Sequence, residues 1–151
     1  MLGPSGEERV NHMALEDDVR QASEQFYAAL NSALNGDPGP MEEIWSHGSD
    51  VSAMHPFGGR ILGWEEVRGS WEQAAQAFSG GQVALEEMVV VPITEDAAYT
   101  LGTEHGQGRI GDETVGIEWR VTNAYRREAD GWKIVHHHTD FSSEVAEALG
   151  L

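Results

Sequence analysis

The chain has 151 residues, of which 40% are hydrophobic and 8% aromatic, and its formal net charge is -17 at pH 7. This length predicts one globular domain with a hydrophobic core, and the excess of acidic residues disfavours nucleic acids and anionic membranes as partners. The absence of cysteine excludes a disulfide framework, a thiolate nucleophile and a zinc-thiolate site. No stretch approaches the roughly 18 apolar residues of a membrane span and no signal segment is recognisable, so a cytoplasmic location is expected.

The first half of the chain predicts an N-terminal arm followed by helices. Residues 1–13 have no apolar period and are expected to form a flexible arm, which leaves 14–151 as the single folded domain. From 15 to 35 apolar residues recur every three or four positions, the spacing of an amphipathic helix. The prolines of the segment that starts at Asp37 predict a short second helix, because proline is tolerated in a first helical turn. A third helix with the same spacing is expected from Trp64 onward.

In the second half the hydrophobic period changes to two, which predicts an antiparallel sheet. After a brief strand at 51–54, the expected strands are 82–93, 97–106, 114–127 and 132–139. The glycine-rich segment 106–111 is expected to be a loose link between two of them. Helices collected first and strands collected last indicate an α+β domain in which the helices cover one face of a curved sheet.

The strand 114–127 shows which of its faces meets the helices. One face carries Val115, Ile117, Trp119, Val121, Asn123 and Tyr125. Asn123 is polar, and a polar side chain on an apolar face requires either a hydrogen-bond partner or a ligand. Both interpretations of Asn123 remain open at this point.

Several segments taken together resemble a known superfamily. The order "ALNGD", "SDVSAMHPFGG", "GWEEVRGSW" and "WRVTNAYRREADGWKIVHHH" resembles NTF2-like proteins, closest to their SnoaL-like and steroid-isomerase-like branch, over residues 15–142. The resemblance implies a cone, with three N-terminal helices packed on a strongly curved antiparallel sheet, a deep apolar pocket and a homodimer. It also implies a small-molecule ligand and, for many members, isomerase, cyclase, dehydratase or hydrolase activity.

The resemblance assigns a candidate base to the turn after the first strand. Steroid isomerases carry a catalytic carboxylate directly before a Pro-Phe-Gly turn, and His55 occupies that place here. An imidazole suits proton transfer near neutral pH, while the alternative is a hydrogen-bonded histidine that ends a strand. The oxyanion-binding tyrosine of those enzymes corresponds to Ala29 and their neutral acid to Asn123, so steroid isomerisation by the same mechanism is not expected.

The last strand adds further candidates. Its parity, together with the pocket of the resembled family, turns His136 and His138 inward, so that they converge with His55 and Asn123 on one cavity. Asp140 has the same parity, and His136, His138 and Asp140 together could also coordinate zinc or iron. A histidine that lines a pocket wall is the favoured interpretation, so neither a metal nor a cofactor is predicted.

Two main hypotheses follow from these residues. In the first, a homodimer binds a small apolar or ring-shaped molecule and performs cofactor-free acid–base chemistry with His55 as the base. The wall or core residues are then Phe26, Ala29, Trp64, Trp71, Trp119 and Tyr125. In the second, the chain is a non-catalytic binding or association module with a filled cone, whose outer sheet face drives self-assembly. A sealed interior, with no cavity near the roughly 300 Å³ of typical ligand sites, would favour this second hypothesis. A third interpretation, metal-assisted hydrolysis through His136 and His138, predicts stoichiometric metal.

Overall fold

The computed structural model describes residues 5–151, apart from the side chains of Val10 and Asn11. Residues 1–4, the start of the predicted arm, lie outside the described residues. The elements in chain order are α1 (Gly6–Leu34), α2 (Gly39–Ile44), β1 (Ser52–His55), β2 (Gly58–Leu62), α3 (Trp64–Ala77), β3 (Phe78–Thr94), β4 (Ala97–Ile110), β5 (Glu113–Glu128), β6 (Gly131–Thr139) and α4 (Ser143–Ala148). Both β2 and α4 are short elements that the hydrophobic periods did not predict.

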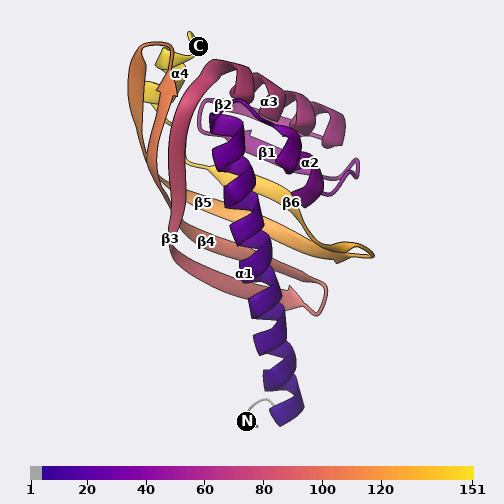
Figure 1. Cartoon of the computed structure of the whole chain (residues 1–151). Coiled ribbons are helices and arrows are strands. Elements are labelled where there is room, and N and C mark those ends of the chain that lie inside the picture. The colour runs from indigo at the N-terminus through magenta and orange to yellow at the C-terminus, as the bar shows by residue number, and fades with distance from the viewer. Residues whose placement is uncertain (1–4) are drawn as a thin grey trace.

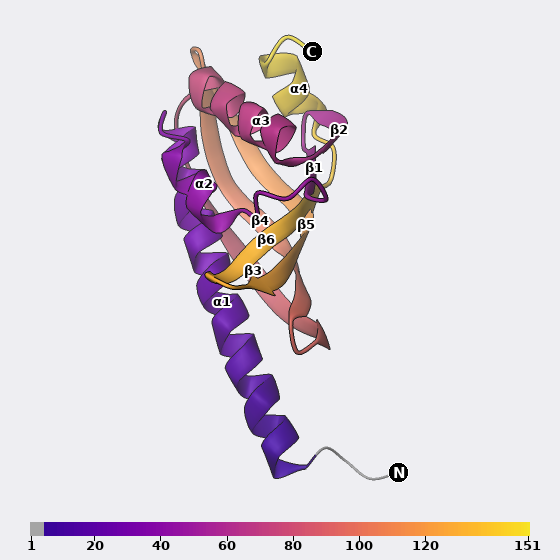
Figure 2. The same cartoon turned by 90° about the vertical axis from the view of Figure 1, so that its right-hand side faces the viewer.

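The strands form one bent sheet in the order β2-β1-β6-β5-β4-β3. Neighbouring strands are antiparallel except β1 and β6, which run parallel. The helices α1, α2 and α3 lie on one side of the sheet, and α4 lies near the C-terminal end of the chain (Figures 1 and 2). The predicted α+β architecture, helices on a curved sheet, is confirmed. Among residues 5–151, none of the helices combines the length and apolar character that crossing a bilayer requires.

The helix α1 begins at Gly6, so the predicted flexible arm is wrong for residues 6–13. Ser5 caps this helix: its Oγ accepts from the backbone nitrogen of Glu8 at 3.1 Å, and the Glu8 carboxylate accepts from the backbone nitrogen of Ser5 at 3.3 Å. This reciprocal capping box was visible as Ser-x-x-Glu in the sequence. The first turns extend beyond the sheet (Figure 1), which is why they have no apolar face.

The segment 106–110 is the end of β4, not the loose link that its glycines suggested. A Cβ at Gly106 would overlap the carbonyl group of Gln82, and a Cβ at Gly108 would lie 2.6 Å from the ring of Phe78. Glycine is therefore needed here because β3 and β4 approach closely, and these residues do not interrupt the strand.

The core lies between α1, α3 and the inner face of the sheet. Val19, Phe26 and Ala33 of α1 are fully buried. The predicted inner face of β5 is confirmed, since Val115, Ile117, Val121, Asn123 and Tyr125 are at most 4% exposed. This burial brings polar residues of the inner face into the middle of the cone.

Candidate functional site

A small cavity lies inside the cone, between α1, α3 and the inner face of the sheet. Its volume is about 50 Å³, far below the roughly 300 Å³ at which typical ligand pockets begin. The open chamber expected from the resemblance is thus largely filled by side chains. The wall is mainly aliphatic and aromatic, and three of its residues are titratable: His55, Glu104 and His137.

His55 ends β1 and is 6% exposed. Its Nε2 lies 2.9 Å from the Oγ of Ser70 in α3, and that hydroxyl donates its only proton to the carbonyl of Val67 at 2.6 Å. Nε2 of His55 must therefore be the donor, which leaves Nδ1 without a proton on the neutral ring. The ring stacks on Phe57 and meets the edge of Trp71. Burial lowers the pKa of His55 to about 4, so the imidazole is neutral at physiological pH.

The three consecutive histidines of β6 are placed differently from the prediction. A β-bulge at Val135 adds one residue to β6 opposite β5, and the alternation of side chains shifts by one position after it. His137 is consequently buried, at 2% exposed, whereas His136 is half-buried and His138 is exposed. The prediction that His136 and His138 face the cavity is wrong for this reason.

The remaining residues of the predicted histidine cluster are engaged away from the cavity. His136 shares a hydrogen bond of 2.7 Å with the Oγ of Ser52, and burial lowers its pKa. Asp140 forms a two-pronged ion pair with Arg120, at 2.9 and 3.0 Å, and these hydrogen bonds lower the pKa of its carboxyl group. Within residues 5–151 no three histidine, aspartate or glutamate side chains are arranged to hold a metal ion.

Asn123 lies behind His137 and does not line the cavity. Its Oδ1 is 2.7 Å from Nδ1 of His137, and its Nδ2 donates to the hydroxyl of Tyr27 in α1 at 3.0 Å. Of the two interpretations of Asn123, the structure thus shows hydrogen bonds to other protein groups. Burial and the neighbouring His55 both lower the pKa of His137, so this ring is also neutral.

Glu104 of β4 supplies a carboxyl group to the same cavity, and it is 2% exposed. One oxygen accepts from Tyr27 and the other from Nε1 of Trp119, each at 2.8 Å. Burial raises the pKa of Glu104 to about 7, while these two hydrogen bonds act in the opposite direction. A carboxyl group with this pKa exchanges its proton near neutral pH.

The predicted wall residues divide into two groups. Trp71 and Trp119 line the cavity. The others do not: Phe26, Ala29 and Tyr125 are buried in the surrounding core, and Trp64 stacks on His47 at a ring distance of 4.4 Å.

Sequence reasoning missed Glu104, Tyr27 and His137. The sequence held no clear signal for Glu104, because it shares its parity in β4 with Ala98 and Thr100, whereas the opposite face carries Tyr99 and Leu101 and is the more apolar of the two. The structure nevertheless buries the face of Glu104 and leaves Leu101 exposed. His137 had no signal either, because its orientation depends on the bulge.

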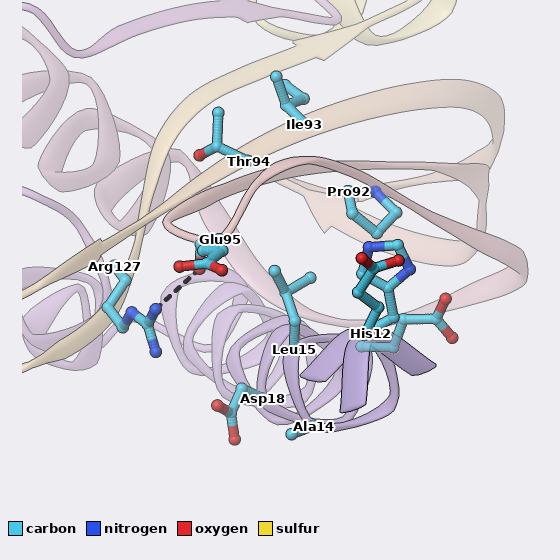
Figure 3. A pocket seen from close by; sticks show the side chains of 11 residues that line it. His12, Ala14, Leu15, Asp18, Pro92, Ile93, Thr94, Glu95 and Arg127 are labelled. Atoms are coloured by element: carbon cyan, nitrogen blue, oxygen red, sulfur yellow. Dashed lines mark hydrogen bonds between the residues drawn. The ribbon is translucent and has the colours of Figure 1, made fainter. Parts of the chain in front are cut away.

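A larger groove of about 680 Å³ lies on the outside of the cone (Figure 3). Residues of α1 such as His12 and Leu15 form one side, and the end of β3 with the following turn forms the other. Arg127 at its edge is bound to the carbonyl of Glu95 and to the carboxylate of Asp96. The groove is rimmed by acidic side chains and lies away from the three titratable residues of the interior.

Comparison with known proteins identifies the family. The SnoaL-like domain family matches residues 19–142. The chain belongs to this family. The SnoaL-like match and the structural neighbours confirm the resemblance to NTF2-like proteins. No curated protein sequence matches the chain.

Solved structures similar to this SnoaL-like chain include proteins of different descriptions. A candidate dehydratase of the NTF2-like family from Streptomyces avermitilis is 27% identical, with a TM-score of 0.72 over 83% of this chain and 94% of that one. An NTF2-like superfamily protein from Salmonella enterica is 18% identical, with a TM-score of 0.75 over 90% and 98% of the two chains. A candidate calcium/calmodulin-dependent protein kinase type II association domain from Thiobacillus denitrificans is 30% identical, with a TM-score of 0.60 over 81% and 93%.

Proposed function

We propose that this SnoaL-like chain binds a small apolar ring compound inside the cone and subjects it to cofactor-free acid–base chemistry. The observation that carries the proposal is the convergence of His55, Glu104 and His137 on one aromatic-walled cavity. Buried titratable groups with shifted pKa values gather at functional sites more often than in ordinary cores. A core that served only to fill the cone would be more stable without them.

The two imidazoles and the carboxyl group suit complementary tasks. The unprotonated ring nitrogen of His55 accepts a proton from the ligand, as a general base. Glu104, with a pKa of about 7, exists in both protonation states near neutral pH and is suited to donate or accept a proton. The indole rings of Trp71 and Trp119 provide apolar contacts to a ring.

Binding of a ring requires side chains to move. The cavity holds about 50 Å³, whereas ligand pockets usually exceed roughly 300 Å³. Phe57 and Trp119 line the cavity and are only partly buried, so they are the side chains that we expect to turn outward. The proposal therefore includes an adjustment of the wall on binding.

The test is protein-observed NMR with phenol, cyclohexanone and indole as probes. We expect at least one probe to shift the resonances of His55, Trp71 and His137, and His138→Ala, on the exposed face of β6, to bind equally well. Native mass spectrometry of protein purified without denaturation is expected to reveal a co-purified small molecule. Shifts confined to the outer groove, or no shifts at all, would contradict the proposal.

A second candidate function, a non-catalytic association module, is favoured by two features of the structure and by one similar protein. The cavity is small, and the outer face of the sheet carries exposed apolar residues, with Val89 53% and Leu101 42% exposed. The relative that is 30% identical is described as an association domain. In this alternative the outer face of the sheet pairs with a second copy of the chain.

A further inference from the structure

A chain of hydrogen bonds connects Glu104 to His137 through the core. Tyr27 donates to Glu104 at 2.8 Å, Asn123 donates to Tyr27 at 3.0 Å, and Nδ1 of His137 lies 2.7 Å from the Asn123 oxygen. These four residues come from α1, β4, β5 and β6 and are at most 7% exposed. We call them the Glu104–His137 relay.

The direction of each hydrogen bond follows from the number of protons available. An ionised Glu104 only accepts, so Tyr27 gives its single proton to Glu104 and its oxygen accepts from Asn123. This orients the Asn123 amide with its nitrogen toward Tyr27 and its oxygen toward His137. An amide oxygen cannot donate, so Nδ1 of His137 carries the proton. Because the neutral ring has one N–H group, Nε2 of His137 has a free lone pair.

His55, the second histidine that lines the cavity, also has one ring nitrogen with a free lone pair. The N–H group of His55 is used by Ser70, and Nδ1 keeps its lone pair. Over residues 5–151, neither Nδ1 of His55 nor Nε2 of His137 has a hydrogen-bond partner. The two oxygens of Glu104 already accept from Tyr27 and Trp119. Two imidazoles on the cavity wall therefore offer acceptors and no free donors.

We propose that the Glu104–His137 relay sets the tautomer of His137, and that the cavity consequently selects a ligand with a hydroxyl group, an alcohol or a phenol, which donates to an imidazole nitrogen. This rests on the proposed function and names its substrate class. Tyr27 and Asn123 act as positioning residues, since they reach the ligand only through His137. Trp71 also lines the cavity, and its buried Nε1 has no partner in the described part of the chain. A hydroxyl oxygen is able to accept from such a donor, so it satisfies both kinds of group.

The first test measures the tautomer directly, without any ligand. Nitrogen-15 NMR of the full chain, at about pH 8.5 where Glu104 is ionised because its pKa is about 7, is expected to show His137 protonated at Nδ1 and unprotonated at Nε2. Tyr27→Phe removes one hydroxyl and releases the Asn123 amide. The Nε2-protonated form of His137 should then become populated while His55 stays unchanged. Ser70→Ala is the matched control, because it should affect His55 and leave His137 as it is.

Two results of this measurement would overturn the relay. One is a wild-type His137 that carries its proton on Nε2. The other is a folded Tyr27→Phe protein in which the tautomer does not change. A merely structural role for Tyr27 would lower stability without moving the proton of His137.

The second test compares phenol with fluorobenzene, which has a similar size and no donor. We expect phenol to bind the wild type about tenfold more tightly, the effect of one added hydrogen bond, and this preference to shrink in Tyr27→Phe. Equal binding of both at the cavity would overturn the hydroxyl selection and leave the proposed function intact. Absence of binding by both, and by every other ring probe, would overturn the proposed function and the ligand class together.

Discussion

The surroundings of Glu104 strongly control its protonation. It lies in the middle of the cone, where burial raises its pKa to about 7 although Tyr27 and Trp119 both donate to it. Removal from water thus outweighs two hydrogen bonds that favour the charged form. Nearby, the same burial acts on His55 in the opposite sense and lowers its pKa to about 4, because its charged form is the protonated one.

The raised pKa of Glu104 predicts how stability depends on pH. Its folded pKa of about 7 exceeds the ordinary value of 4.5, so its contribution to stability is fully present below the lower value and is lost as pH rises through the higher one. The loss amounts to about 3 kcal/mol for a fully buried group. Urea unfolding between about pH 5 and pH 8 should therefore show wild-type protein losing stability relative to Glu104→Gln as the pH rises.

The control for this prediction is Glu118→Gln, which changes an exposed glutamate on the neighbouring strand β5. Its stability curve should run parallel to that of the wild type. The wild type and Glu104→Gln running parallel as well would show that the carboxyl of Glu104 titrates normally. His55 contributes the opposite slope in all three proteins, since its lowered pKa gives stability that is lost as pH falls from 6.5 toward about 4.

At the scale of elements, the bulge in β6 decides which histidine enters the core. If Val135 alternated as a regular strand residue and did not form the bulge, His136 and His138 would share the buried face of Ile134 and His137 would face outward. With it, His137 packs against Phe26 and Trp71 and bonds to Asn123. The bulged conformation of one residue therefore decides which histidines at the end of this strand face the core.

This register predicts different effects of alanine at three consecutive positions. His137→Ala should lower the free energy of unfolding by about 2 to 4 kcal/mol, since it leaves a hole in the core and an unpaired oxygen on Asn123. His138→Ala should change it by less than about 0.5 kcal/mol, because the side chain is exposed. His136→Ala should fall between them through loss of the bond to Ser52. Urea unfolding measures all three, and a loss for His138→Ala equal to that for His137→Ala would contradict the bulge.

At the scale of the whole molecule, the outer face of the sheet is where we expect a second copy of the chain to pack. Val89 and Leu101 face each other across β3 and β4, and Val91 and Tyr99 form the next outward pair. These four residues make an apolar strip on an otherwise acidic protein with a net charge of -17. An exposed apolar strip on a sheet is typical of a surface that another protein covers.

The strip predicts the effect of one charge on the oligomeric state. Wild-type protein at micromolar concentration should sediment as a dimer, and Leu101→Glu should sediment as a monomer because a carboxylate would be buried at the interface. Leu62→Glu is the matched control, since Leu62 is 64% exposed on β2 and should leave the dimer intact. Monomeric wild-type protein in analytical ultracentrifugation would rule out association through this face.

The hydrophobic periods of the sequence by themselves determined the class of fold. The spacing of three and four from 15 to 35 and the alternation in β5 placed the helix and the inner face of the strand correctly, including buried Asn123. Such patterns are local, because they depend only on the spacing of apolar residues along one helix or one strand. The capping box at Ser5 was an equally local signal that the hydrophobic pattern alone did not reveal.

Only the tertiary structure decided what the site contains. Tyr27 meets Glu104 and Asn123 across separations of 77 and 96 residues, and no local pattern reports which partner a buried hydroxyl finds at such a distance. Whether His136 or His137 faces the interior depends on how β6 pairs with β5, and this pairing is a property of the two strands together. The size of the cavity depends on how far side chains from different elements fill the cone, and packing of that kind is settled only when all of them are present.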